Sequence, residues 1–140
     1  MYKILSHTAD IALEVWAESL PGLFQEAARG FHDLLLEDAP IRAEQRRQIE
    51  LSSDEPEDLL VQWLSELNYF VTVHAWLWGA VEDFTLAAEN GIWRLKAAVS
   101  GEALDAQRHY LYFDIKAVTY HQLEITDTPD GCQTRIVFDI

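Results

Sequence analysis

Two stretches of the chain place their apolar residues three and four positions apart, the spacing of an amphipathic helix. The first stretch follows Ser19, a residue type suited to helix capping, and ends at residues 37–40. The second follows Ser53 or Asp54, with Pro56 and two acidic residues in its first turn. We therefore expect two helices, each burying one apolar stripe: Leu20, Leu23, Phe24, Ala27, Ala28, Phe31, Leu34 and Leu35 in the first, and Leu59, Leu60, Trp63, Leu64, Leu67 and Val71 in the second.

Most of the remaining chain is rich in β-forming residues, which predicts strands. Asn90-Gly91 is a strong hairpin signal, and a second turn is expected over residues 127–131. The strands follow one another without regular strand–helix alternation, so we predict a single α+β domain over residues 1–140. Its mostly antiparallel or mixed β-sheet would have the two amphipathic helices packed on it. The expected strands cover residues 11–17, 48–51, 79–89, 92–100, 110–126 and 133–140.

Acidic residues dominate the charge of the chain. Asp and Glu number 24 against 10 Lys and Arg, which gives the 140 residues a formal net charge of −14. Because nucleic-acid binding draws affinity from basic side chains that neutralise phosphates, stable direct binding to RNA or DNA is disfavoured. A basic protein partner or a cation is favoured instead, although solubility is the simpler explanation of acidity by itself.

Several kinds of site and location find no support in the sequence. Cys132 is the single cysteine, so neither an intramolecular disulfide nor a CxxC zinc motif can form. The glycines are scattered singly and form no phosphate-binding loop, which argues against a nucleotide-binding enzyme. No signal peptide and no run of about 18 apolar residues is present. We expect a cytoplasmic protein that does not enter the membrane and keeps its thiol reduced.

The last strand offers a candidate cation site. Strand alternation places Ile136, Phe138 and Ile140 on one face, which would anchor the end of the chain. The Asp139 side chain and the α-carboxylate of Ile140 would then lie close together and repel each other unless a cation lies between them. Asp10 would add a third carboxylate if its loop lies alongside. Clustered oxygen ligands suit Ca²⁺ or Mg²⁺, whereas the alternative is a set of solvated carboxylates at a strand end.

Lys116 interrupts a β-rich segment. Strict alternation places it on the same face as Asp114, Val118 and Tyr120. Lys116 would either face solvent, the commoner position for lysine, or lie beside the carboxylates and pair with an anion or with Asp114.

Two further constellations involve histidine. His7 and His121 could bind a transition metal together with Asp10. Ser6, His7 and Asp10 invite comparison with a catalytic triad, but three residues so close in sequence rarely converge, and no GxSxG motif occurs.

Five stretches, in order along the whole chain, resemble the archease family: residues 7–10, 57–67, 101–109, 115–121 and 136–140. The resemblance implies an accessory protein, not itself an enzyme, that promotes guanylylation and multiple turnover of an RtcB-type RNA ligase in tRNA splicing or RNA repair. It also implies a metal site, usually described with calcium, at Asp10, Asp139 and Ile140, with Mg²⁺ or Mn²⁺ as alternatives. Lys116 matches a position tied to activation, with His7 and His121 as further candidates.

Two residues depart from the family pattern: Asp114 stands where the family often has Glu, and Asn68 is more polar than the usual apolar run. Two other functions remain open. A metal-dependent hydrolase could use the same carboxylates with His7 or His121 as general base. A chaperone-like interaction module would instead require an exposed apolar patch.

Overall fold

The structure, a computed structural model, describes residues 1–6 and 9–140. In this part of the chain two helices and eight strands occur. In chain order they are β1 (Tyr2–Ser6), β2 (Asp10–Ala17), α1 (Leu20–Leu36), β3 (Gln45–Ser53), α2 (Pro56–Thr72), β4 (Trp76–Glu89), β5 (Ile92–Ala103), β6 (Ala117–Thr119), β7 (Thr126–Thr128) and β8 (Gly131–Asp139).

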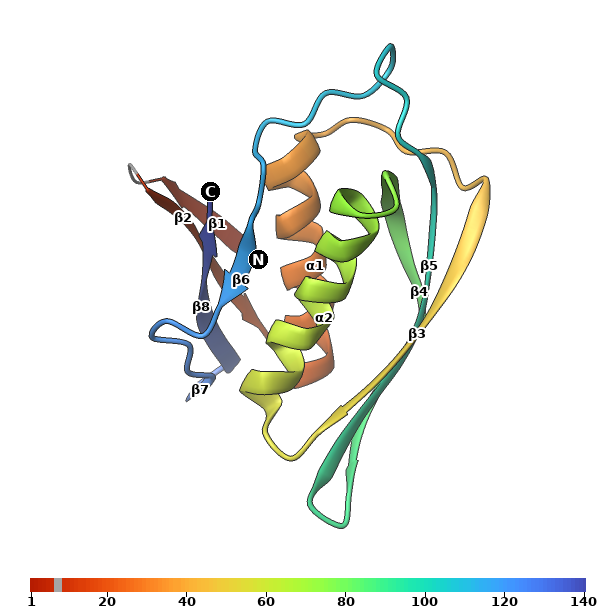
Figure 1. The fold of residues 1–140 in the computed structure, drawn as a ribbon. Coiled ribbons are helices and arrows are strands. Elements are labelled where there is room, and N and C mark those ends of the chain that lie inside the picture. Colours follow the sequence, from red (N-terminus) through yellow and green to blue (C-terminus); the bar gives the residue numbers. More distant parts are fainter. Residues whose placement is uncertain (7–8) are drawn as a thin grey trace.

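The strands form two antiparallel sheets with both helices between them (Figure 1). One sheet has the order β1-β2-β8-β6, with β7 also paired to β8, and the other has the order β3-β5-β4. The predicted α+β class and the antiparallel pairing are confirmed. The division into two sheets goes beyond the prediction, and it gives each helix apolar surface to bury on both sides.

Aromatic side chains connect the three layers. Phe31 of α1 stacks on Phe138 of β8 with ring centroids 4.8 Å apart, and it meets Trp78 of β4 at 5.3 Å. The indole N–H of Trp63 on α2 donates to the carbonyl of Phe24 on α1 at 3.0 Å, which satisfies a buried donor. All five side chains are fully buried, so both sheets and both helices share one core.

The helix starts agree only partly with the sequence prediction. Ser19 caps α1 as predicted, since its hydroxyl accepts the backbone N–H of Gly22 at 3.1 Å. The prediction that Ser53 or Asp54 caps α2 is wrong, because Glu55 occupies that position without a side-chain cap. The hydroxyl of Ser53 instead accepts the N–H of Glu55 and donates to Asp58 at 2.7 Å.

The strand predictions were accurate for the hairpin and poor for residues 110–126. Asn90 and Gly91 have φ of 54° and 77°, the left-handed conformation that a tight hairpin turn needs. The prediction of one strand over residues 110–126 is wrong, because only β6 and β7 form there. In the described residues, neither helix is long and apolar enough to cross a membrane.

Candidate functional site

Asp10 and Asp139 lie directly opposite each other on β2 and β8. Their neighbours Ile11 and Phe138 point into the core and are about 1 % or less exposed, so the two carboxylates lie on the outer face of the sheet. Directly opposed side chains on antiparallel strands have Cβ atoms about 4.5–5.5 Å apart. Like charges at that spacing destabilise a sheet unless a cation or a hydrogen-bond donor lies between them.

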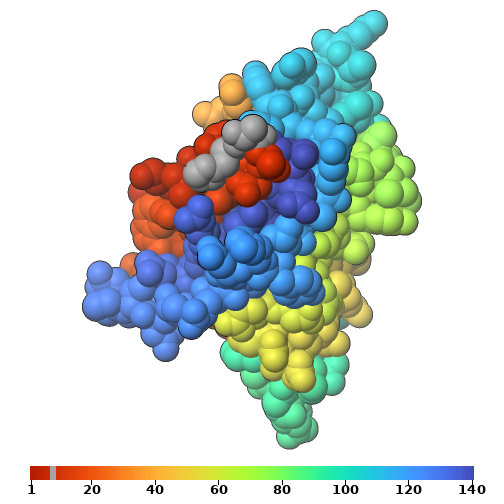
Figure 2. All heavy atoms as spheres, turned by 60° about the vertical axis from the view of Figure 1, so that its left-hand side comes forward, coloured from red at the N-terminus to blue at the C-terminus, as the bar shows by residue number. Residues whose placement is uncertain are grey.

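A third segment brings Lys116 to the same place. Ala117 of β6 pairs with Asp139 on the other side of β8, and the N–H of Lys116 donates to the carbonyl of Asp139 at 2.8 Å. Figure 2 looks onto this side of the molecule, where the red N-terminal strands, the dark blue end of β8 and the lighter blue segment containing β6 adjoin. The backbones of Asp10, Asp139 and Lys116 therefore lie side by side, although these residues come from the two ends of the chain and from the segment that begins β6.

The carboxylates near the end of β8 have the oxygen chemistry of a hard-cation site, but the described side chains do not assemble one by themselves. Ile140 follows Asp139 and packs against the core, so its α-carboxylate emerges at the same edge as the two aspartates. Three carboxylates supply oxygen ligands of the type that Ca²⁺, Mg²⁺ and Mn²⁺ prefer. Within residues 1–6 and 9–140, no group of three His, Cys, Asp or Glu side chains is placed to hold a metal, so a cation here would depend on the main-chain carboxylate and on water or a partner.

Lys116 does not share a face with Val118 as alternation suggested. Lys116 and Ala117 are both exposed, whereas Ile115 and Val118 on either side of them are buried. The regular strand begins only at Ala117, so the period of two does not extend back to Lys116. The exposed position of Lys116 is compatible with both alternatives, a lysine that faces solvent and a lysine beside the carboxylates, because the carboxylates also lie on the outer face.

The histidine hypotheses find less support. His7 lies outside the described residues, so its part in the triad and in a transition-metal site stays a prediction. His121 lies in the turn after β6 and is exposed, and its N–H donates to the Thr119 hydroxyl at 3.2 Å. Because β6 runs away from Asp139 as it approaches His121, the register does not bring that imidazole to the carboxylates.

Proteins of one family match the chain over its whole length. A model described as the Archease protein family matches residues 2–140. The chain belongs to the archease family. Protein archease of Methanosarcina acetivorans is 35 % identical over 139 residues, covering 99 % of this chain and 95 % of the relative. Protein archease of Thermococcus gammatolerans is 33 % identical over 125 residues, covering 89 % and 87 %.

Solved archease-family structures have the same fold. The solution structure of a Methanobacterium thermoautotrophicum protein superposes with a TM-score of 0.82 at 22 % identity, covering 99 % of this chain and 98 % of that chain. A crystal structure from Thermotoga maritima, described as an archease and possible chaperone, gives 0.58 at 24 % identity, covering 100 % and 98 %. At these identities the likeness concerns the fold alone.

In this archease-family chain, polar side chains of α2 hold the segment on either side of β6, a role that sequence reasoning missed. The hydroxyl of Tyr120 donates to Asp58 at 2.6 Å, and the N–H of Ile125 donates to Glu57 at 3.1 Å. The hydrogen bond from Tyr120, with others from Ser53 and a glutamine, lowers the pKa of Asp58. The same bond between Tyr120 and Asp58 raises the pKa of Tyr120. From the sequence alone, these two acidic residues are interpreted only as favourable charges at the positive end of the helix dipole.

At the other end of α2, Asn68 reaches the residue before Lys116. Its side-chain Nδ2 donates to the carbonyl of Ile115 at 3.0 Å, and the contact is buried. The sequence did contain a signal, because Asn68 interrupts an apolar helical stripe. Nothing local, however, could say which distant backbone group it meets.

The family motif around Glu102 serves a different part of the fold. Glu102 on β5 is 1 % exposed; its carboxylate pairs with Arg108 and accepts the N–H of Arg42 at 2.6 Å. The hydrogen bond from Arg108, opposed by burial and assisted by Arg42, holds the pKa of Glu102 at about 2. His109 accepts the N–H of Asp105 at 2.9 Å. These contacts fasten the segments around residues 42 and 105–109 to the end of β5, in the three-stranded sheet and not in the sheet of Asp10 and Asp139.

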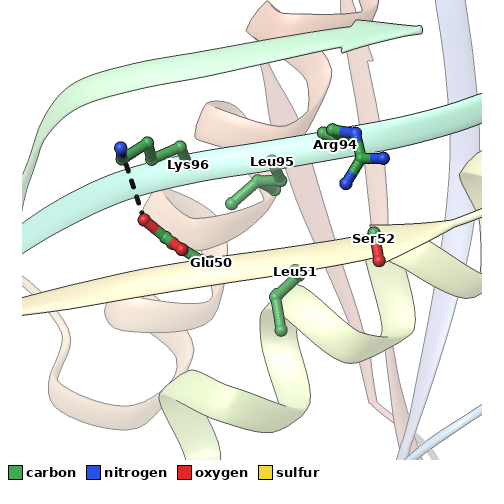
Figure 3. A pocket seen from close by; sticks show the side chains of 6 residues that line it. All are labelled: Glu50, Leu51, Ser52, Arg94, Leu95 and Lys96. Atoms are coloured by element: carbon green, nitrogen blue, oxygen red, sulfur yellow. Dashed lines mark ion pairs between the residues drawn. The ribbon is translucent and has the colours of Figure 1, made fainter. Parts of the chain in front are cut away.

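An open hollow of about 390 Å³ is lined by residues of the paired strands β3 and β5 (Figure 3). Lys96 Nζ and Glu50 Oε1 form an ion pair across it at 3.3 Å, and both side chains are about two-thirds exposed. An exposed pair of this kind contributes little to stability. Lys96 is therefore a suitable control for Lys116, because it is an exposed lysine in the other sheet, remote from Asp10 and Asp139.

Proposed function

We propose that this chain is a non-catalytic accessory protein that activates an RtcB-type RNA ligase by promoting its guanylylation and multiple turnover. The observation that carries the proposal is the main-chain hydrogen bond from Lys116 to Asp139, which places Lys116 next to the strand position where Asp139 opposes Asp10. An exposed lysine beside a candidate cation site can act on a phosphoryl group that a partner enzyme presents. Family membership is what directs the proposal towards a ligase.

The chemistry of guanylylation fits such a division of labour. Phosphoryl transfer depends mainly on positioning and on neutralising charge on the phosphate oxygens. A divalent cation, in the first place Ca²⁺ with Mg²⁺ or Mn²⁺ as alternatives, would supply charge neutralisation. Asp10, Asp139 and the Ile140 carboxylate would hold it, while Lys116 would present its ammonium group beside it. His7 and His121 remain secondary activation candidates.

Charge favours a protein partner with a basic cleft. The net charge of −14 complements the positive surface that a ligase needs for RNA and nucleotide, and such complementarity speeds encounter. The same charge opposes stable binding of RNA by the chain itself. In this proposal, the chain meets the ligase in the cytoplasm, where the reaction takes place.

A chaperone-like role is the second candidate. Tyr110 and Tyr112 are 69 % and 46 % exposed and contact each other edge to face at 4.8 Å, so two large aromatic side chains are available to a client. The description of the Thermotoga maritima protein as a possible chaperone points the same way. Suppression of aggregation of an unrelated unfolded protein, with no ligase present, would separate this role from ligase activation.

The test of the first proposal is multiple-turnover RNA ligation by the RtcB-type ligase of the same organism, with and without substoichiometric amounts of this chain. Turnover and covalent ligase–GMP should both rise with the wild-type chain, and Asp139→Ala should abolish the rise. Asp130→Ala is the matched control, because Asp130 is an exposed aspartate in the turn at the other end of β8. No change in guanylylation or turnover with wild-type chain would overturn the proposal.

The same samples test the hydrolase alternative. The chain alone is incubated with phosphate esters and RNA in the presence of divalent cations. Activity that depends on Asp139 would replace the accessory role by metal-dependent hydrolysis. Its absence alongside ligase activation would support the accessory role.

A further inference from the structure

The peptide group between Ile115 and Lys116 is hydrogen-bonded at both ends to different layers of the fold. Its carbonyl oxygen, that of Ile115, accepts Nδ2 of Asn68 on α2 at 3.0 Å. Its N–H, that of Lys116, donates to the carbonyl of Asp139 on β8 at 2.8 Å. A peptide group is a rigid plane, so two bonds on opposite ends fix its rotation.

The rotation of this plane controls where Lys116 points. The plane sets one of the two backbone dihedrals at the Lys116 Cα, and the Cβ direction follows from the backbone at that atom. The regular strand, which pairs with β8, begins only at Ala117 on the far side of Lys116, so the Ile115–Lys116 plane itself lies outside the strand ladder. Among the described residues, Asn68 is the one side chain that forms a hydrogen bond with this peptide group.

We propose that Asn68 is a positioning residue that orients Lys116 towards the carboxylates of Asp10 and Asp139; this rests on the proposed function of Lys116 in ligase activation. Asn68 does not itself contact those carboxylates in any hydrogen bond of the described residues. It acts through the Ile115–Lys116 peptide group, which joins α2 to the end of β8.

The environment of Asn68 argues against a purely structural purpose. The residue is 8 % exposed within an apolar helical stripe, and its Oδ1 is buried with no hydrogen-bond partner in the described residues. A buried unpaired acceptor costs stability, so the amide is a poor choice for packing alone. Leucine has the same number of side-chain heavy atoms in the same branched arrangement and would remove that cost. It would also release the Ile115 carbonyl, so stability and activation should respond differently to the substitution.

The test compares Asn68→Leu and Asn68→Ala with Thr72→Val in the full-length chain. Thr72 is the matched control, because its hydroxyl donates to the carbonyl of Asn68 at 3.0 Å in the same part of α2 without touching the Ile115–Lys116 peptide. Far-ultraviolet circular dichroism and thermal unfolding establish that each variant folds. Asn68→Ala adds no new polar or larger group and serves if the leucine variant does not fold.

Two measurements follow. The first is hydrogen exchange of the Lys116 amide by NMR, without ligase; we expect exchange about tenfold faster in both Asn68 variants and unchanged in Thr72→Val. The second is ligase–GMP formation at increasing chain concentration. The maximal stimulation should fall about tenfold or more in the Asn68 variants, with the half-maximal concentration unchanged, because orientation is lost while docking is retained.

Several outcomes would overturn the inference. Wild-type exchange at Lys116 in the Asn68 variants would show that the amide does not hold the peptide group. Equal loss of stimulation in Thr72→Val would show a general effect of disturbing α2. If the wild-type chain fails to stimulate the ligase, the proposed function fails and the inference fails with it. If the Asn68 variants show faster exchange at Lys116 but wild-type stimulation of the ligase, Asn68 holds the peptide group without affecting activation, and the inference is also rejected.

Discussion

Asp10 and Asp139 stand opposite each other at the ends of β2 and β8, on the outer face of the sheet. Two carboxylates in directly opposed positions repel, and the chain's overall negative charge adds to that repulsion. The arrangement therefore lowers the stability of the strand ends unless a cation occupies the site, which makes the site measurable through stability alone.

We first predict that Ca²⁺ stabilises the wild-type chain and not Asp139→Asn. A ligand that binds only the folded state adds about 2.7 kcal/mol at a concentration one hundred times its Kd. Asp139→Asn removes one opposed charge, so the variant without metal should be about 0.2–1 kcal/mol more stable than wild type. Urea unfolding with Ca²⁺ and with chelator measures both effects.

Asp130→Asn is the control for this prediction, because it changes an exposed aspartate at the far end of β8. It should keep the full response to Ca²⁺. An equal response to Ca²⁺ in Asp139→Asn and wild type would show that the cation binds elsewhere or not at all.

The second prediction separates Lys116 from basic residues in general. Lys116→Ala should lower maximal stimulation of the ligase about tenfold or more, because a positioned cationic group is lost at the phosphoryl site. Lys96→Ala, which removes an exposed lysine of the three-stranded sheet, should leave stimulation unchanged. Initial rates of ligase–GMP formation at saturating chain provide the measurement, and equal loss in the two variants would reduce the role of Lys116 to overall charge.

Thirdly, Tyr120→Phe should destabilise the fold in a pH-dependent manner. The bond from Tyr120 is the main cause that lowers the pKa of Asp58, so it stabilises the folded state while Asp58 is ionised. Its contribution, about 0.5–1 kcal/mol for an exposed pair, should be complete above the ordinary aspartate pKa of about 3.9 and disappear as pH falls through the lower folded value.

Urea unfolding of wild type and Tyr120→Phe at neutral pH and near pH 3 tests this sign. The difference in unfolding free energy should shrink at the acidic pH. A difference that stays constant would mean that Tyr120 contributes through packing rather than through the Asp58 carboxylate.

The fourth prediction concerns Glu102. Its pKa of about 2 lies below the ordinary glutamate value because of Arg108 and the N–H of Arg42, so its ionised form stabilises the fold. That stability is present above the ordinary pKa of about 4.3 and is lost as pH falls towards 2. Glu102→Gln should lower the melting temperature at neutral pH and flatten its acid dependence over this interval, as thermal unfolding in a pH series would reveal. A parallel acid dependence in wild type and variant would contradict this assignment.

Segment 110–126 explains why one strand prediction failed. Its tyrosines, leucines and valine have the composition of a strand, and local propensity carries no information about pairing. In the structure, side chains from α2 bond to the backbone of this segment at Ile115 and Ile125 and to the Tyr120 hydroxyl, and these contacts hold the segment outside β6 and β7. Propensity was overridden by hydrogen-bonding partners that are distant in sequence.

The sequence by itself determined the two helices, the hairpin at Asn90-Gly91, the α+β class and the family, because each depends on spacing between neighbours or on motifs along the chain. It also singled out Asp10, Lys116, Asp139 and Ile140 as a group. Only the tertiary structure decided that β2 and β8 pair in the register that opposes Asp10 to Asp139, and that Asn68 meets the peptide before Lys116. Register and long-range hydrogen bonds depend on which distant segments share a sheet or a core, and a local pattern of polar and apolar residues does not encode that choice.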